Sequence, residues 1–491
     1  MTVVDALRAR AAADPSRLAL VTQARPDGPA ERISYAALVT DMDRIAASLR
    51  SAGVKAAERC GLVAPQGPLF VAHALGILAA DGCLVPIADE LGTAGFASVC
   101  HEARLAHFVH VSEASHGRVH VSDASHERVR IEPAPEGGFE HEEAFRALRP
   151  CYLRFTSGTT HRRKGVVLGH ATVKARLDAA NSALGIGPSD AILWLLPMAH
   201  HFVVSILLYL REGATILLPA SGLARPALRL AEQEGATLLY ASPFHHQLLA
   251  RDRGTEKLER LRLAISTAEG LRTDVAQAFA ARFGRPLVQA LGVIECGLPV
   301  MNLVAAERKP EAIGRALAGY DVWLRDESGR PVSQHGPEHT GELCIRGAGL
   351  LDAYLVPWTP AASVLVPDGF RTGDQAWRDE DGDLHLVGRR ANRINVAGMK
   401  FFSEEVEAVL DSHPQLRRSR VEGRVHAHLG EIPVASVVPR DPARAPQPDE
   451  LRAFCRERLP AYKVPREFQL VESLPTTATG KLMRWSGDCD A

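Results

Sequence analysis

The sequence has few lysines and no long hydrophobic run. Of its 57 basic residues eight are lysines and 49 are arginines, and the 58 acidic residues leave a net charge of −1. This balance argues against a whole-chain attraction to nucleic acid or to an anionic membrane. No uninterrupted apolar stretch reaches the roughly 20 residues that a membrane-spanning helix needs. We therefore expect neither a nucleic-acid partner nor a membrane partner.

Cysteine is also sparse, and no secretory signal is visible. The eight cysteines include no CxxC pair and form no dense framework, which argues against a zinc finger and against a disulfide scaffold. Asp5, Arg8 and Arg10 follow Met1 where a secretory signal would have an apolar segment. These observations predict a protein of the reducing cytoplasm.

The length predicts two or three domains, because 491 residues are too many for one compact core. After Ser34, a candidate helix cap, apolar residues recur at helical spacing. Two short apolar runs, 60–64 and 83–87, flank the helix-like stretch 70–80. Strand, helix and strand in this order predict an α/β layer with parallel strands. The helical set is Leu38, Met42, Ile45 and Leu49.

Residues 110–129 contain one ten-residue pattern twice, HVSEASHGRV and then HVSDASHERV. Four histidines in it are candidate metal ligands, namely His110, His116, His120 and His126. Valines that alternate with polar residues are instead typical of a surface strand and turn. The alternation favours a duplicated strand and turn over a metal site.

The end of the chain has the pattern of a small α+β unit. A helix is predicted to follow Ser403, because Glu404 and Glu405 suit the positive end of a helix dipole. Pro414 would end this helix. Its apolar face consists of Val406, Val409 and Leu410.

The most informative stretch is 152–166, YLRFTSGTTHRRKGV. Its small residues let backbone N–H groups approach an anion, its hydroxyls add donors, and its basic residues add charge. A Walker A loop would need Gly-Lys-Ser/Thr, whereas Lys164 is followed here by Gly165 and Val166. The stretch therefore predicts a phosphate loop, but not that of an ordinary P-loop NTPase.

This loop resembles the TSGTTGxPKG loop of adenylate-forming enzymes, which include acyl-CoA synthetases, firefly luciferase and the adenylation domains of peptide synthetases. Other segments resemble that family in its own order: an opening block at 33–87, GELCIRG at 341–347, TGD at 372–374, GR at 388–389 with 394–398, FSEEVE at 402–407 and TGK at 479–481. Each triplet alone is a weak signal, but six or more in the family order are a strong one.

The resemblance implies an α/β fold in two parts. Residues 1–388 would form a large N-terminal domain of stacked β-sheets and helices. Residues 389–491 would form a small, mobile α+β C-terminal domain.

The resemblance also assigns the residues that handle ATP. Lys164 and the loop hydroxyls would hold the β- and γ-phosphates, and Glu295 with Thr160 would hold Mg²⁺, which prefers carboxylate oxygen. Asp374 would accept hydrogen bonds from the ribose, and Arg389 would contact the nucleotide. The loop set is Thr156, Ser157, Gly158, Thr159 and Thr160, and the residues beside the adenine and acyl groups are Ala268, Glu269, Gly270 and Gly292.

Two residues of the small domain carry the reaction cycle that the resemblance implies. Lys481 would reach the substrate carboxylate and the α-phosphate during adenylation. The domain would then swing and present the face of Gly398 to form a thiol tunnel. The acceptor thiol is that of coenzyme A or of phosphopantetheine on an acyl or peptidyl carrier protein, and the sequence leaves this choice open.

The expected substrate is a small carboxylic acid without an α-amino group. Amino-acid-activating relatives place an aspartate after the phosphate loop, but residues 196–205 contain no carboxylate. A buried ammonium without a partner would be costly. This stretch resembles the PxxH segment of fatty-acid and aryl-acid CoA ligases. His200 is the formal match, His201 fits if the register slips by one, and a packing role is the alternative for either.

Several residues depart from the family pattern. His161 and Arg163 replace a Gly and a Pro of the loop, and Ile294 removes a threonine hydroxyl that would contact phosphate. Leu291 replaces a tyrosine, and Ala391 occupies a usually charged hinge position. Because the main charged residues remain, we expect an active acid–thiol ligase. The alternatives are a non-catalytic nucleotide- or acyl-binding relative and an enzyme that stops at the acyl-adenylate.

We predict that Lys481→Ala suppresses adenylation much more than thioester formation from a supplied acyl-adenylate, because this lysine would act in the first step only. Carboxylate-dependent ATP–pyrophosphate exchange and thioester formation measure the two steps separately. Equal losses in both steps would contradict the swinging-domain assignment.

Overall fold

A computed structural model of the chain describes residues 2–23, 25, 28–87, 99–112, 128–133, 139–155, 164–365, 369–397, 399–426, 428–476 and 482–483. The chain divides into two compact units. The first unit is Met1–Asp321 with Arg346–Phe370, and the second unit is Val322–Ile345 with Arg371–Ala491. The domain boundary expected at residue 389 stays a prediction, because compactness alone does not say which segments move.

The first unit contains a nine-stranded sheet in the order β15-β14-β13-β12-β11-β9-β10-β1-β2. Its central strands run parallel, since β10 pairs with β9, β9 with β11, β11 with β12, and β12 with β13 in that sense. The strands are β1 (Leu18–Gln23), β2 (Ala30–Ser34), β9 (Ala191–Trp194), β10 (Thr215–Leu218), β11 (Leu238–Ala241), β12 (Leu263–Ser266), β13 (Leu287–Val293), β14 (Gly297–Met301) and β15 (Arg315–Ala316).

The same unit contains an eight-stranded sheet in the order β19-β18-β8-β7-β4-β3-β5-β6. The predicted parallel pair is present here, because β3 and β4 run parallel in register Cys60 to Leu84. The strands are β3 (Arg59–Val63), β4 (Cys83–Pro86), β5 (His107–Ser112), β6 (Arg128–Pro133), β7 (Pro150–Phe155), β8 (Gly165–Gly169), β18 (Ala353–Tyr354) and β19 (Thr359–Pro360).

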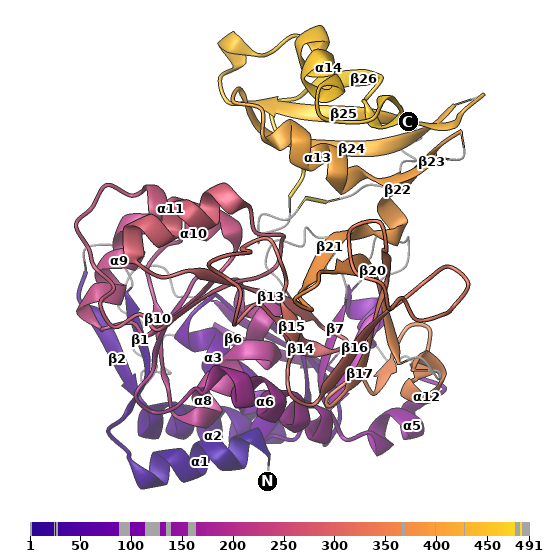
Figure 1. Cartoon of the computed structure of the whole chain (residues 1–491). Coiled ribbons are helices and arrows are strands. Elements are labelled where there is room, and N and C mark those ends of the chain that lie inside the picture. Colours follow the sequence, from indigo (N-terminus) through magenta and orange to yellow (C-terminus); the bar gives the residue numbers. More distant parts are fainter. Residues whose placement is uncertain are drawn as a thin grey trace. The chain divides into compact units, whose positions relative to one another are not determined.

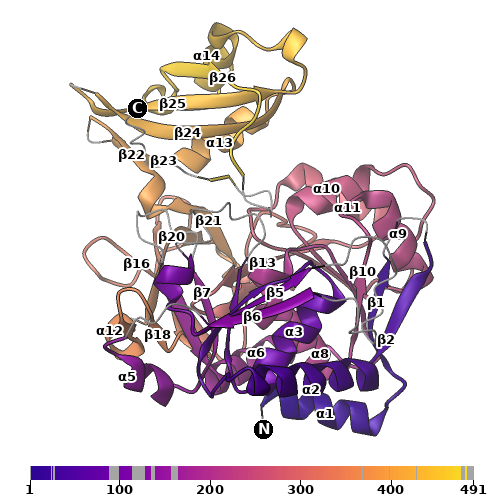
Figure 2. The ribbon, with the colours of Figure 1, turned by 180° about the vertical axis from the view of Figure 1, so that it is seen from behind.

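Helices pack between and around these sheets (Figures 1 and 2). Helices α2 and α3 contact each other, α2 contacts β1 of one sheet, and α3 contacts β3 and β4 of the other. The helices of the unit are α1 (Val3–Ala13), α2 (Tyr35–Ser51), α3 (Pro68–Ala79), α5 (Glu142–Ala147), α6 (His170–Leu184), α7 (Met198–His201), α8 (Leu207–Glu212), α9 (Ala224–Gln233), α10 (Pro243–Arg251), α11 (Thr273–Phe283) and α12 (Ala361–Val364), with a π-helical segment at Phe202–Ile206.

The helix predicted after Ser34 is confirmed as α2, and so is its cap. In α2 the side chain of Ser34 accepts a hydrogen bond from the backbone N–H of Ala37 at 3.1 Å. The predicted apolar positions Leu38, Met42 and Leu49 are buried. Of the ten-residue repeat, the structure describes only parts of β5 and β6, which pair antiparallel. His116, His120 and His126 lie outside the described residues.

The second unit contains two smaller sheets. One has the order β16-β17-β20-β21, and the other joins β23, β22, β25 and β24, with β26 paired to β25. Its elements are β16 (Tyr320–Arg325), β17 (Gly341–Gly347), β20 (Phe370–Arg378), β21 (Leu384–Arg389), β22 (Arg393–Val396), β23 (Met399–Phe402), α13 (Ser403–Asp411), β24 (Leu416–His426), β25 (Gly430–Pro439), α14 (Pro448–Arg456) and β26 (Glu467–Leu470).

Helix α13 is the helix predicted near residue 403, and it begins at Ser403 rather than after it. Glu405 accepts a hydrogen bond from the backbone N–H of Phe402 at 2.8 Å, which satisfies one donor of the first turn. Val406 and Leu410 are buried in a separate hydrophobic core beneath β24 and β25. The chain is thus a mixed α/β protein with a large N-terminal region of several sheets and a small C-terminal α+β part, as predicted. Among the described helices, none is both long and apolar enough to cross a bilayer.

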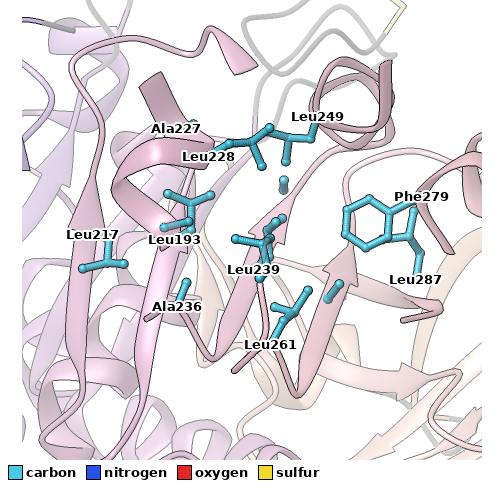
Figure 3. Packing of buried hydrophobic residues seen from close by; sticks show 14 of the residues in the cluster. Leu193, Leu217, Ala227, Leu228, Ala236, Leu239, Leu249, Leu261, Phe279 and Leu287 are labelled. Carbon is cyan, nitrogen blue, oxygen red and sulfur yellow. The ribbon is translucent and has the colours of Figure 1, made fainter. Parts of the chain in front are cut away.

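The outer face of the nine-stranded sheet has its own hydrophobic core. Helices α9, α10 and α11 contact β10, β11 and β13 on this face, and Figure 3 shows leucines of strands and helices meeting around Leu239. This core fixes the helices that follow the parallel strands, so it also fixes where those strands end.

We predict that Leu239→Ala lowers the free energy of unfolding by about 2–5 kcal/mol, because the side chain is fully buried and its loss leaves a cavity. Chemical denaturation measures the change. Leu223→Ala is the matched control, since Leu223 is 63% exposed and its truncation should cost little. Equal effects of the two substitutions would contradict this packing.

Candidate active site

The predicted site residues of the first unit gather at one edge of the nine-stranded sheet. Strands β9, β11, β12 and β13 are parallel neighbours, so their carboxyl ends meet at the same edge. His200 and His201 follow β9, residues 267–270 follow β12, and Glu295 follows β13. Ligands of open α/β sheets bind at such edges. The topology thus brings together residues that lie almost 100 positions apart.

His201 belongs to a buried aromatic cluster. Its ring lies edge-on to Trp194 and Tyr240, with centroids 5.8 and 6.1 Å away, and the last two rings stack at 5.2 Å. Burial holds the pKa of His201 well below its usual range. These are the contacts of a packing residue, which was one of the two roles expected for it.

His200 lies in the same turn of α7 but has a different environment. Burial, assisted by the positive charge of Arg154, lowers its pKa to about 4. The imidazole is therefore neutral at neutral pH. Its backbone carbonyl accepts a hydrogen bond from Nη1 of Arg154. Neither histidine can supply a positive charge to the site, nor a negative one.

The loop after β12 has an unusual backbone. Ala268 has a φ of 77°, in the left-handed region that a residue with a Cβ rarely adopts, and such conformations concentrate at functional sites. Next to it, Thr267 donates a hydrogen bond to the carbonyl of Ala290 at 3.2 Å. Thr267 Oγ1 also lies 3.7 Å from where a Cβ on Gly292 would be. The structure therefore places the predicted Ala268–Gly270 loop beside Gly292.

Glu295 forms a group with Tyr354 and Lys164. The Tyr354 hydroxyl donates to Glu295 Oε1 at 3.1 Å, and Lys164 Nζ lies 4.8 Å from the centre of the Tyr354 ring. Burial and the neighbouring Glu295 raise the pKa of Tyr354, so the phenol stays protonated and remains a donor. Pairing of β18 with β8, Tyr354 opposite Val166, brings these segments together. The sequence predicted Lys164 and Glu295 but not the tyrosine between them.

Arg176 on α6 holds the turn that carries Glu295. It is 2% exposed, and its Nη1 donates to the carbonyl of Ile294 at 3.0 Å. Its Nε and Nη2 donate to the carbonyl of Gly349. The carbonyl of Glu295 in turn accepts from the N–H of Leu351 at 2.7 Å. No motif pointed to Arg176, since an arginine within a helix carries no distinguishing pattern.

In the second unit the structure pairs Asp374 with Arg389. These residues face each other across β20 and β21, and Arg389 Nε donates to Asp374 Oδ1 at 3.0 Å. A hydrogen bond within its own turn also fixes the backbone of Asp374, since its N–H donates to Thr372 Oγ1 at 3.0 Å. The two residues predicted to bind the nucleotide are therefore neighbours, and their roles toward ribose and phosphate stay predictions.

The other predicted residues lie outside the part of the chain that the structure describes. They are Thr156, Ser157, Gly158, Thr159, Thr160, Gly398 and Lys481, with the departures His161 and Arg163.

A magnesium site is compatible with the described donors. Within the described ranges, no three His, Cys, Asp or Glu side chains cluster as a metal cage. Mg²⁺ does not need one, since it is commonly bound by one or two carboxylates together with substrate phosphates and waters. A single oriented carboxylate, Glu295, fits that mode.

Comparison with known proteins identifies the family. Residues 7–355 match the AMP-binding enzyme family, and residues 405–481 match the AMP-binding enzyme C-terminal domain. The chain belongs to the AMP-binding enzymes. It is an adenylate-forming enzyme of the AMP-forming acid–CoA ligase family, as the motifs indicated.

Individual relatives of this AMP-binding enzyme differ in the acid they are named for. A feruloyl-CoA synthase of Amycolatopsis is 28% identical over 92% of both chains. A long-chain-fatty-acid–CoA ligase of Yersinia pestis is 29% identical over 68% of this chain and 60% of its own. The ATP-bound structure of MatB from Rhodopseudomonas palustris has the same fold, with a TM-score of 0.80, 23% identity and coverage of 98% and 97%.

We predict that Tyr354→Phe lowers kcat/KM for ATP by about 10- to 100-fold, because a hydrogen bond to a charged group is worth about 1.5–3 kcal/mol. The ring that contacts Lys164 is retained, so the change isolates the bond to Glu295. Initial rates at varied ATP and Mg²⁺ concentrations measure the effect.

Tyr35→Phe is the control for this substitution. Tyr35 is also buried, and its hydroxyl lies within hydrogen-bonding distance of the carbonyls of Leu210 and Ala214. This variant should lose stability but keep kcat/KM per folded molecule. If Tyr354→Phe behaves like the control, the bond to Glu295 has no role in ATP handling.

Proposed function

We propose that this protein activates a fatty or aryl acid with ATP, forms an acyl-adenylate with release of pyrophosphate, and transfers the acyl group to the thiol of coenzyme A. The arrangement of Lys164, Tyr354 and Glu295 beside the phosphate-loop segment carries this proposal. It joins an exposed ammonium and an oriented carboxylate at the carboxyl edge of the sheet.

Formation of an acyl-adenylate requires that the protein stabilise charge in the transition state, not that it form a covalent bond to the substrate. When a carboxylate attacks the α-phosphorus, negative charge crowds the transition state, and fixed positive groups lower its energy. Lys164 would bind the β- and γ-phosphates, and Glu295 would hold Mg²⁺, which neutralises phosphate charge when bound. Tyr354 orients both groups, because its hydroxyl holds the carboxylate and its ring holds the ammonium.

The segment after β9 supports an acid without an amino group. Residues 196–206 contain no carboxylate, and both imidazoles there are neutral at neutral pH. The only described charge that acts on both of these histidines is the positive one of Arg154. A substrate ammonium would therefore be unpaired and repelled. The aromatic pair Trp194 and Tyr240 suits an apolar acyl group, as in relatives named for ferulic and long-chain fatty acids.

The acceptor is proposed to be coenzyme A because the relatives are named as CoA synthases and ligases. Phosphopantetheine on a carrier protein has the same thiol arm. It is therefore the alternative outcome when acceptors are compared.

We predict carboxylate-dependent ATP–pyrophosphate exchange with members of a fatty-acid and aryl-acid panel, and none with α-amino acids, because the latter bring an unpaired ammonium. Adding coenzyme A or a phosphopantetheinylated carrier protein to the active acids then identifies the acceptor by thioester formation.

Glu295→Gln is the control for exchange, since it keeps the shape of the side chain but removes the charge proposed to hold Mg²⁺. If no carboxylate supports exchange while ATP still binds, the ligase proposal is wrong and a non-catalytic binding protein remains. Exchange without transfer to either thiol would identify an enzyme that stops at the adenylate.

A further inference from the structure

Arg154 is a half-buried cation whose Nε is shielded from solvent, and no described carboxylate pairs with it. Within the described ranges, three arginines have a guanidinium nitrogen that is shielded from solvent and makes no hydrogen bond: Arg59, Arg154 and Arg282. Arg59 and Arg282 are compensated, by Glu142 at 2.9 Å and by Asp252 at 3.7 Å. No described carboxylate forms such a pair with Arg154, and burial lowers the pKa of its guanidinium. A charge shielded in this way is costly unless something else pairs with it.

Arg154 differs from Arg176 in its hydrogen bonds, because its Nε has no partner among the described residues. Arg176 is buried and likewise has no carboxylate partner among the described residues, but its Nε, Nη1 and Nη2 all donate to backbone carbonyls. For Arg154 the described bonds are limited to the one from Nη1 to the carbonyl of His200, and its Nε makes none. The hydrogen bonds of Arg176 to the protein are therefore complete without a ligand, whereas those of Arg154 to the described residues leave its Nε without a partner.

The position of Arg154 places these donors at the reaction centre of the proposed enzyme. It lies on β7, two residues before the phosphate-loop segment begins at Thr156. Tyr152 and Arg154 lie on the same side of this strand, and their side chains bond the carbonyls of Ala199 and His200 in α7. The charge of Glu295 also acts on the pKa of this guanidinium, which it raises against the larger lowering effect of burial. Arg154 thus contacts α7, on the proposed acyl side, and is influenced by Glu295, on the proposed phosphate side.

We propose that Arg154 is a further catalytic residue, which binds the α-phosphate and the carboxylate at the point where they react. The inference rests on the proposed function. A guanidinium is planar and presents paired donors that match phosphate or carboxylate oxygens. It would supply the contact that Ile294, where the family pattern has a hydroxyl, cannot make. Lys164, held with Glu295 through Tyr354, serves the β- and γ-phosphates instead.

The proposed step conserves atoms and charge without a proton transfer to Arg154. A carboxylate oxygen of the acid forms a bond to the α-phosphorus. The bond from that phosphorus to the bridging oxygen breaks, and pyrophosphate leaves with the electron pair. Arg154 donates hydrogen bonds to the α-phosphate oxygens before, during and after this exchange. It should act again when a thiol displaces AMP, since the same phosphate is then the leaving group.

We predict that Arg154→Met lowers kcat for pyrophosphate exchange by about 10²- to 10³-fold, as for the loss of one oxyanion-stabilising donor. Thioester formation from a supplied acyl-adenylate should fall as well, unlike the effect predicted for Lys481→Ala. Binding of AMP should weaken by about 10- to 100-fold while binding of adenosine is unchanged, because the two differ in the α-phosphate. Arg154→Lys, which keeps the charge, should recover part of both properties.

Arg59→Met is the matched control, because it removes a buried arginine of the same unit that is paired with Glu142. It should lower the unfolding temperature but leave exchange per folded molecule unchanged. If Arg154→Met does not fold, Arg154→Lys and Arg154→Gln serve in the same AMP and adenosine comparison.

Equal affinities of the wild-type protein and the Arg154 variants for AMP overturn the proposal. A loss confined to acids with a second anionic group also overturns it, and assigns Arg154 to the distal end of the acid. The nucleotide comparison needs no acid substrate. It therefore separates a failure of this inference from a failure of the proposed ligase activity, which would show as absent exchange in the wild-type protein.

Discussion

The geometry of the site depends on one buried guanidinium, that of Arg176. Its hydrogen bonds to Ile294 and Gly349 tie together two segments of chain that flank Glu295. The chain after Gly349 then runs to β18, where Tyr354 reaches Glu295. Without these bonds, the buried carbonyls would lose partners and the turn would have no fixed position.

This arrangement constrains the backbone around the arginine. Gly349 has a φ of 73°, and a Cβ there would lie 2.6 Å from the Cβ of Arg176. Gly297 has a φ of 85°, and a Cβ there would lie 3.3 Å from the Cβ of Arg176. Glycine is required at both positions because the arginine fills the space that a side chain would need. One buried cation thus requires glycine at two of its packing partners, Gly297 just after Glu295 and Gly349 in the segment that leads to Tyr354.

The sequence was sufficient to predict features whose signal is local. It was insufficient to predict residues whose role arises from contacts between distant segments. Helix α2 could be predicted from its spacing and from Ser34, because capping acts within one turn. Lys164 and Glu295 could be predicted because they lie in motifs. Tyr354 could not, since its importance comes from a strand pair that joins residues more than 180 positions apart.

The shortage of lysine has a physical counterpart in this site. Arg176 donates from three nitrogens to three carbonyls, those of Ile294, Glu295 and Gly349, and a lysine ammonium on a flexible stem could not hold that planar geometry. Lys164 has the opposite environment, because its compact ammonium lies over the Tyr354 ring in an exposed residue, where the proposed phosphate contact could form. In this site the arginine Arg176 is structural and buried, whereas the lysine Lys164 is exposed. Arg154 combines both demands, since it is half-buried and its Nε has no hydrogen-bond partner among the described residues, and the proposed phosphate ligand would bring the negative charge that it lacks.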